Sequence, residues 1–164
     1  MSIDPQRFRA VLGHFPTGVT VVTGMAGGEP VGLTIGSFTS VSLDPPLVGF
    51  LPMVDSVRWH AIRDSGSFCV NVLGADHGDL CWQFAKSSIE RPFEGVGWRP
   101  APATGSPLLD GVVAWMDCTI EEVVPAGDHH FVMGRIVELD HLGGEHEPTP
   151  LLFFRGQLGR FTGL

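Results

Sequence analysis

The stretch GLTIGSFTSVSLDPP, residues 32–46, decides the fold, because it reads as an extended strand that ends abruptly. This strand is predicted to begin near Val31 and to run through Phe38 toward Ser42. Asp44-Pro45-Pro46 then breaks it, since proline has no N–H to give to a sheet. Residues 19–23 (VTVVT) are β-branched throughout, and residues 47–51 (LVGFL) are a nearly all-apolar run. Both are typical of strands, the second of a buried one, so this region predicts consecutive strands.

A few helices flank further strands. The first helix is predicted to begin at Asp4-Pro5, because Asp suits the N-cap and Pro the first helical position. Its hydrophobic residues form one stripe that Pro16 ends: Phe8, Val11, Leu12 and Phe15. Residues 56–62 and 76–85 are predicted helices, and residues 68–73, 112–123, 131–140 and 151–154 are predicted strands, with a possible extension over 157–161. Residues 86–110 are irregular and rich in Gly and Pro, which favours a functional or mobile loop.

Many strands and few helices in 164 residues predict a mainly β fold. We expect a closed antiparallel barrel with peripheral helices, because closure removes the exposed edges of a sheet. The length suits a single domain over residues 1–164.

Composition excludes several classes of protein. The formal net charge is −8 and Lys86 is the single lysine, so no basic cluster is available for nucleic acid. No apolar run approaches the roughly 20 residues of a membrane helix, and the N-terminus lacks the regions of a signal peptide, so we expect a cytoplasmic protein away from membranes. The three cysteines are far apart, which argues against a disulfide framework and a thiolate zinc site.

Five stretches in this order resemble the short-chain flavin reductases that serve two-component flavin-dependent monooxygenases. They are residues 15–23 (FPTGVTVVT), 32–46, 65–73 (SGSFCVNVL), 127–129 (GDH) and 150–156 (PLLFFRG). The resemblance implies a Greek-key split barrel of the FMN-binding type. It also implies a homodimer with one flavin per subunit near the interface. The expected activity is hydride transfer from NADH or NADPH to FMN or FAD, with reduced flavin released to a separate monooxygenase.

The flavin is expected against residues 34–37, because small side chains let backbone N–H groups approach the acceptor edge of the ring. By the resemblance this segment contributes Thr34, Ile35, Gly36 and Ser37, followed by Ser40 and Val41. Family members typically have Ala and then Asn or Ser where this chain has Ile35 and Gly36. Binding is therefore expected to shift from side chain to backbone. The alternative is an ordinary strand with a glycine bulge.

The flavin phosphate is expected at the start of the second predicted helix, where free N–H groups and the helix dipole favour an anion. Ser56, Val57 and Arg58 occupy this turn, and Arg58 stands where the family usually has Thr. Arg58 is read as a phosphate ligand, with a solvated surface Arg as the alternative. By the resemblance a second phosphate-side segment adds further residues: Phe84, Ala85, Lys86 and Arg91.

His129 is the expected catalytic residue, because the family places the His of Gly-Asp-His beside flavin and nicotinamide. We favour positioning of the nicotinamide over acid catalysis, and a hairpin residue without a role is the alternative. Pro16, Thr17 and Arg155 resemble further nicotinamide-side positions. His130 should point to the opposite face of its strand. No metal site is expected, because the two adjacent His side chains diverge and no HExxH spacing occurs.

Two other functions stay open. The chain could be a flavin-binding split barrel without reductase activity, such as a carrier, a sensor or an oxidase of another substrate. It could also be a barrel that binds no flavin and serves protein interaction. The sequence does not choose between FMN and FAD or between NADH and NADPH.

Overall fold

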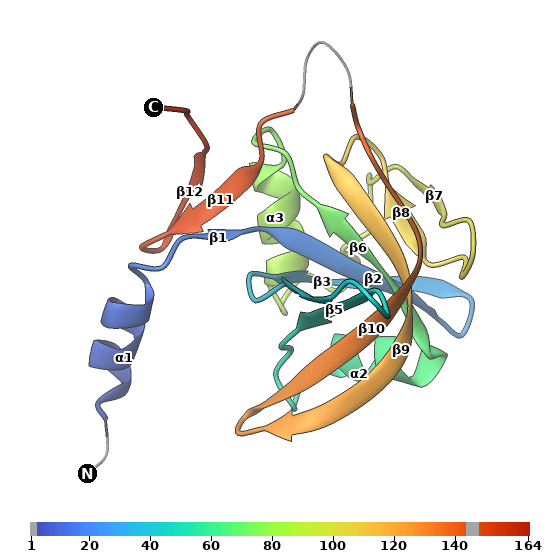
Figure 1. Ribbon diagram of the computed structural model, residues 1–164, viewed down its shortest axis with the longest axis horizontal. Helices are drawn as coiled ribbons and strands as arrows, with labels where there is room; N and C mark the ends of the chain where they lie inside the picture. The colour runs from blue at the N-terminus through green and yellow to red at the C-terminus, as the bar shows by residue number, and fades with distance from the viewer. Residues whose placement is uncertain (1–2, 144–147) are drawn as a thin grey trace.

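The computed structural model describes residues 3–143 and 148–164 and is built around one antiparallel sheet. Its strands in chain order are β2 (Thr20–Ala26), β3 (Glu29–Ile35), β4 (Thr39–Ser42), β5 (Leu47–Phe50), β6 (Ser67–Val72), β9 (Ala114–Ala126) and β10 (His129–His141). In space the order is β3-β2-β6-β9-β10-β5-β4, and the sheet curls strongly (Figure 1). The prediction of a mainly β fold with few helices is confirmed.

Closure of the barrel is not confirmed, because no ladder joins the edge strands β3 and β4 within residues 3–143 and 148–164. The two edge strands nevertheless follow each other in the chain, linked by Gly36, Ser37 and Phe38. The prediction of one strand from Val31 toward Ser42 is therefore wrong. The chain leaves one edge of the sheet at Gly36 and joins the other edge at Thr39.

Two helices cover the sheet, and their ends follow the local chemistry of the sequence. In α2 (Val57–Ser65) the Ser56 side chain caps the first turn by accepting from Trp59 N at 3.3 Å, and Gly66 ends the helix with a φ of 80°. The second helix, α3 (Gly78–Ala85), buries Cys81 and Phe84.

The core lies on both faces of β2. Val21 belongs to a cluster with Leu73 and Phe84, whereas its neighbour Val22 belongs to a cluster with Phe50 and Trp59. Successive strand residues point to opposite faces, so burial of both valines shows that β2 is covered on both sides.

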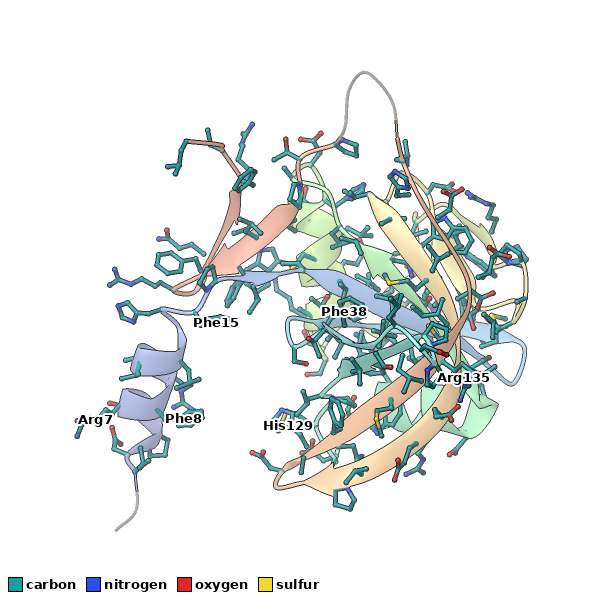
Figure 2. All side chains as sticks on the ribbon, in the orientation of Figure 1. Arg7, Phe8, Phe15, Phe38, His129 and Arg135 are labelled. Carbon is teal, nitrogen blue, oxygen red and sulfur yellow. The ribbon has the colours of Figure 1, made fainter. Side chains whose placement is uncertain are left out.

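A separate arm projects from this body (Figure 1). It consists of α1 (Pro5–Leu12) and a three-stranded sheet of β1 (Thr17–Gly18), β11 (Leu151–Phe154) and β12 (Gln157–Arg160). The predicted N-cap is confirmed, since Asp4 accepts from Arg7 N at 2.9 Å. The helix ends at Leu12, before the predicted end at Pro16. Its predicted apolar stripe stays exposed, with 53% of Phe8 in α1 and 73% of Phe15 beyond its end accessible (Figure 2).

The loop predicted over residues 86–110 contains a short hairpin of β7 (Trp98–Pro100) and β8 (Pro107–Leu109). The buried carboxylate of Asp117 holds the tip, accepting from the backbone N–H of Ala103 at 2.8 Å and of Thr104 at 3.0 Å. Among the described helices none has the length and apolar character needed to cross a membrane.

Candidate active site

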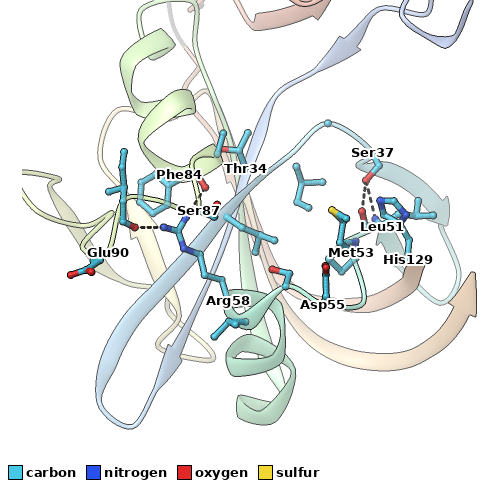
Figure 3. A pocket seen from close by; sticks show the side chains of 18 residues that line it. Thr34, Ser37, Leu51, Met53, Asp55, Arg58, Phe84, Ser87, Glu90 and His129 are labelled. Atoms are coloured by element: carbon cyan, nitrogen blue, oxygen red, sulfur yellow. Dashed lines mark hydrogen bonds between the residues drawn. The ribbon is translucent and has the colours of Figure 1, made fainter. Parts of the chain in front are cut away.

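One pocket of about 980 Å³ lies where the chain crosses from β3 to β4 (Figure 3). Its walls come from the end of β3, from the segment after β5, from the start of α2, from the end of α3 and the segment after it, and from the first residue of β10. The lining is largely apolar, and Arg58 and His129 lie at opposite ends. A cleft of this size and character suits a cofactor.

The pocket brings together most of the residues predicted for the site. The predicted residues in its walls are Thr34, Ile35, Gly36, Ser37, Ser56, Val57, Arg58, Phe84, Ala85 and His129. Sequence reasoning missed eight other lining residues, although Pro52 and Met53 directly follow a predicted strand. The eight are Leu33, Leu51, Pro52, Met53, Asp55, Ser87, Ile89 and Glu90.

Several predicted flavin contacts do not line the pocket. Ser40 and Val41 lie on β4, after the chain has crossed to the other sheet edge. Lys86 ends α3 and presents its backbone carbonyl to Arg58, and Arg91 is an exposed residue further along the loop.

Of the four residues predicted to bind the nicotinamide, His129 lines the pocket, whereas Pro16, Thr17 and Arg155 do not. Thr17 Oγ1 would stand 3.4 Å from a Cβ placed on Gly36, so Thr17 borders the rim. Pro16 precedes it in the chain. Arg155 occupies the turn between β11 and β12 with a φ of 50°, and its N–H donates to the carbonyl of Gly13 at 3.1 Å. It therefore lies against the end of α1.

The hydroxyls at the β3 end are already engaged within the protein. Thr34 Oγ1 donates to the carbonyl of Cys81 in α3 at 2.7 Å. Ser37 Oγ accepts from Leu51 N at 2.9 Å and donates to Leu51 O at 3.3 Å. Ile35 is 5% exposed and belongs to the core. What this wall can offer a ligand is therefore mainly its backbone around Gly36.

Arg58 is bound by carbonyl groups rather than by a carboxylate. Its guanidinium donates to the carbonyls of Phe84 at 2.8 Å and Lys86 at 3.2 Å, and also to that of Ile89. Burial lowers the pKa of Arg58 from its ordinary value. Because a guanidinium has five N–H groups, two remain for a ligand. Arg58 thus joins α2 to the segment after α3 and places a positive charge at this end of the pocket.

His129 lies at the other end, on the hairpin between β9 and β10. Its Nδ1 lies 2.7 Å from Asp128 Oδ1. This hydrogen bond, together with the charge of the His ring, lowers the pKa of Asp128. The backbone is fixed as well, since Val54 N donates to Asp128 O at 3.0 Å and Met53 pairs with His129. With Nδ1 turned to Asp128, Nε2 is the nitrogen that can meet a ligand.

His130 points away from the pocket lining, as strand alternation predicts. Its Nδ1 accepts the indole N–H of Trp59 at 3.0 Å. Within residues 3–143 and 148–164, no group of three or more His, Cys, Asp or Glu side chains is arranged to hold a metal ion.

Comparison with known proteins identifies the family. A family model described as a flavin reductase like domain matches residues 12–162. The chain belongs to this flavin reductase family. The resemblance seen in the sequence is thereby confirmed.

Curated relatives agree with this assignment. A flavin reductase of Pseudomonas putida is 49% identical over 99% of this chain and 94% of its own length. The reductase subunit HsaB of a flavin-dependent monooxygenase of Rhodococcus jostii is 45% identical over 99% of this chain and 80% of its own. An Agrobacterium fabrum protein named FMN reductase (NADH) is 38% identical over 97% and 87%.

Solved structures share the fold. Component B of the nitrilotriacetate monooxygenase of Mycobacterium thermoresistibile superposes with a TM-score of 0.91, at 43% identity over 96% of this chain and 86% of its own. The NADH:FAD oxidoreductase of Streptomyces globisporus superposes with a TM-score of 0.87, at 35% identity over 99% and 92%.

Proposed function

We propose that this protein is an NAD(P)H-dependent flavin reductase that supplies reduced flavin to a partner monooxygenase. The pocket between Arg58 and His129 carries the proposal. It unites an apolar cleft, a backbone edge at Gly36 and a fixed cation at the start of α2. Relatives named as FMN and FAD reductases that use NADH support both the flavin and the hydride donor. A relative named as a monooxygenase reductase subunit supports the partner.

The pocket residues fit a flavin. Leu33, Pro52 and Phe84 can cover the apolar faces of the ring, and the backbone around Gly36 can donate to its acceptor edge. The α2 N-terminus and the two free N–H groups of Arg58 suit the first phosphate, which FMN and FAD share. Bound flavin would accept the hydride, while the protein residues bind and orient the two partners. We keep Lys86 and Arg91 as proposed outer phosphate contacts, and Ser40 and Val41 as proposed flavin contacts.

We further propose that His129 positions the nicotinamide. Its ring is fixed by Asp128 and its side chain is 36% exposed, so Nε2 has a defined direction at an end of the pocket that solvent reaches. Thr17 at the rim and Pro16 are proposed to contact the same group. Arg155 is proposed to lie on that side as well.

Steady-state oxidation of NADH and NADPH, each with added FMN and FAD, tests the function. We expect at least one flavin to accelerate the loss of NADH or NADPH. We also expect reduced flavin to accumulate when oxygen is absent. A protein that binds flavin but does not accelerate this loss would be a carrier, a sensor or an oxidase of another substrate. A protein that binds no flavin would be an interaction module.

The variant His129→Ala tests the proposed positioning role. It should slow flavin reduction or raise the NADH concentration required, with little change in flavin affinity, because the ring lies at the end of the pocket opposite the proposed phosphate ligand Arg58. Single-turnover reduction measured across NADH concentrations decides this. Rates equal to those of the unmodified protein would rule the role out.

We propose that the protein is a homodimer held in part by the arm. The eight-residue helix α1 buries none of its residues, and an isolated helix of this length is marginal in water. Its exposed stripe and Phe154 of β11 form apolar surface that a second copy would cover. Phe15→Glu should shift sedimentation toward the monomer. Leu43→Glu, at a 92% exposed site in the turn after β4, is the matched control and should leave the dimer intact.

Three further properties belong to this proposal. We propose that the curled sheet acts as a split barrel, with the Ser37 side chain tying the connection between the two edge strands to Leu51 after β5. We propose that residues 1–164 form one domain. We also propose a cytoplasmic location, where the three free cysteines would remain reduced.

A further inference from the structure

Trp59 and His130 form a side-chain hydrogen bond between residues 71 positions apart in the chain. Trp59 Nε1 donates to His130 Nδ1 at 3.0 Å, and the ring centroids are 6.3 Å apart with a tilt of 56°. Trp59 is fully buried in the first turn of α2, and His130 is half-buried at the start of β10. The bond therefore joins a helix to a strand at a site with limited access to water.

The location of this bond relates it to the pocket. Trp59 directly follows Arg58, and His130 directly follows His129, and these two neighbours lie at opposite ends of the pocket (Figure 3). Neither Trp59 nor His130 lines the pocket itself. The bond thus links the two ends from outside the lining.

The neighbouring contacts make this link rigid. Phe50 packs edge-on against the indole of Trp59, with centroids 5.7 Å apart and planes at 88°, which fixes the direction of the indole N–H. The backbone N–H of His130 donates to the carbonyl of Pro52 at 3.0 Å, and Pro52 lines the pocket. His130 therefore contacts both the helix and the segment after β5.

The chemistry of the pair requires an acceptor at position 130. An indole N–H is only a donor, so His130 Nδ1 must present its lone pair and the ring proton must lie on Nε2. An apolar residue at this position would leave the Trp59 N–H buried without its partner. Leaving a buried donor unpaired costs more than the bond itself contributes.

We propose that His130 is a positioning residue, which holds the α2 end of the pocket against the His129 end through Trp59. The inference rests on the proposed function, because it assigns flavin as the ligand of this pocket. Without the bond the two ends of the pocket can move apart in the free protein. Flavin binding then has to restore their spacing. The effect should therefore appear in flavin affinity rather than in the rate at saturating flavin.

Three single variants and one double variant test the proposal by FMN binding and by the FMN dependence of NADH oxidation. His130→Leu and Trp59→Phe should each weaken FMN binding about fivefold and raise the half-saturating FMN concentration equally, with kcat at saturation unchanged. The double variant should also lose about fivefold, because the second change has no bond left to break. His130→Asn should restore the affinity, since its Oδ1 can take the place of Nδ1 as acceptor.

Trp115→Phe on β9 is the matched control, because Trp115 lies outside the pocket and should leave FMN binding unchanged. A double variant weakened about 25-fold, as independent effects predict, would overturn the proposal. So would His130→Asn binding as weakly as His130→Leu, or variants that lower the melting temperature without changing FMN affinity. If His130→Leu does not fold, the proposal still predicts weaker FMN binding for Trp59→Phe and unchanged FMN binding for His130→Asn.

Tryptophan emission separates failure of this inference from failure of the proposed function. Replacing His130 by Leu should shift the emission of the protein, and the same replacement in a Trp59→Phe background should not. Equal shifts in both backgrounds would overturn the bond. If the His130→Leu variant shows the expected shift but the unmodified protein neither binds nor reduces flavin, the proposed function is overturned instead.

Discussion

Replacing Arg58 separates two roles that its position allows: a phosphate ligand and a connection between pocket walls. The guanidinium donates to three backbone carbonyls that lie 26, 28 and 31 residues away, so it fixes the segment after α3 against α2. Hydrogen bonds of charged donors contribute about 1.5–3 kcal/mol each when buried. The bond to Lys86 is exposed and the freed carbonyls can bind water, so we expect a loss of about 2 kcal/mol for all three. If flavin binding requires this wall, affinity should fall about 30-fold.

The assay is a titration with FMN and with riboflavin, which lacks the phosphate. Arg58→Lys keeps the charge but cannot reach three carbonyls, so both ligands should bind about 30-fold more weakly. Arg58→Met should weaken FMN further than riboflavin. Arg63→Met on the same helix is the control, because Arg63 pairs only with its exposed neighbour Asp64 among the described residues. Arg58→Lys with unchanged affinity for both ligands would refute the connecting role.

Three further outcomes are expected. The lowered pKa of Asp128 means that its carboxylate is ionised at neutral pH and that its contact with His129 is lost only as the pH falls through that lowered value. Carbon-13 NMR should give a midpoint below that of an unperturbed aspartate, and a midpoint at or above it would contradict the contact. Burial raises the pKa of Cys118 to about 12, so iodoacetamide at pH 8 should label it only after unfolding, as read by mass spectrometry. Asp117→Ala should lower the free energy of unfolding in urea by about 3 kcal/mol, because the N–H groups of Ala103 and Thr104 lose their buried acceptor, and a change below about 1 kcal/mol would contradict this.

Features that depend on neighbouring residues could be predicted from the sequence. The cap at Asp4 depends on a contact three residues away, and it is present. Divergence of His129 and His130 follows from strand alternation. Each of these is decided within one or two turns of the chain, where sequence and geometry are directly coupled.

Features that depend on distant partners could not be predicted. The interruption of the strand at Gly36 depends on which sheet edge the following residues join, and no pattern among neighbouring residues predicts which edge that is. The carbonyl partners of Arg58 come from the last turn of α3 and from the segment after it, so the sequence alone suggested only a phosphate ligand or a surface residue. The hydrogen bond between Trp59 and His130 joins residues 71 positions apart, and no repeating pattern in the sequence indicates it.

Gly36 offers a test of whether the pocket or the fold requires glycine. A Cβ at this position would meet only Thr17 Oγ1, at 3.4 Å, which ordinary packing tolerates, and the backbone is not in the left-handed region. The protein itself therefore has room for alanine, and the need for glycine would come from a ligand lying against the backbone. Gly36→Ala should keep the melting temperature within about 2 °C while weakening FMN binding about tenfold. Gly159→Ala on β12, with nothing within 4 Å of the added Cβ, should change neither property. If Gly36→Ala binds FMN as the unmodified protein does, flavin does not approach the backbone here. The expectation that backbone contacts replace side-chain contacts at this position would then be wrong.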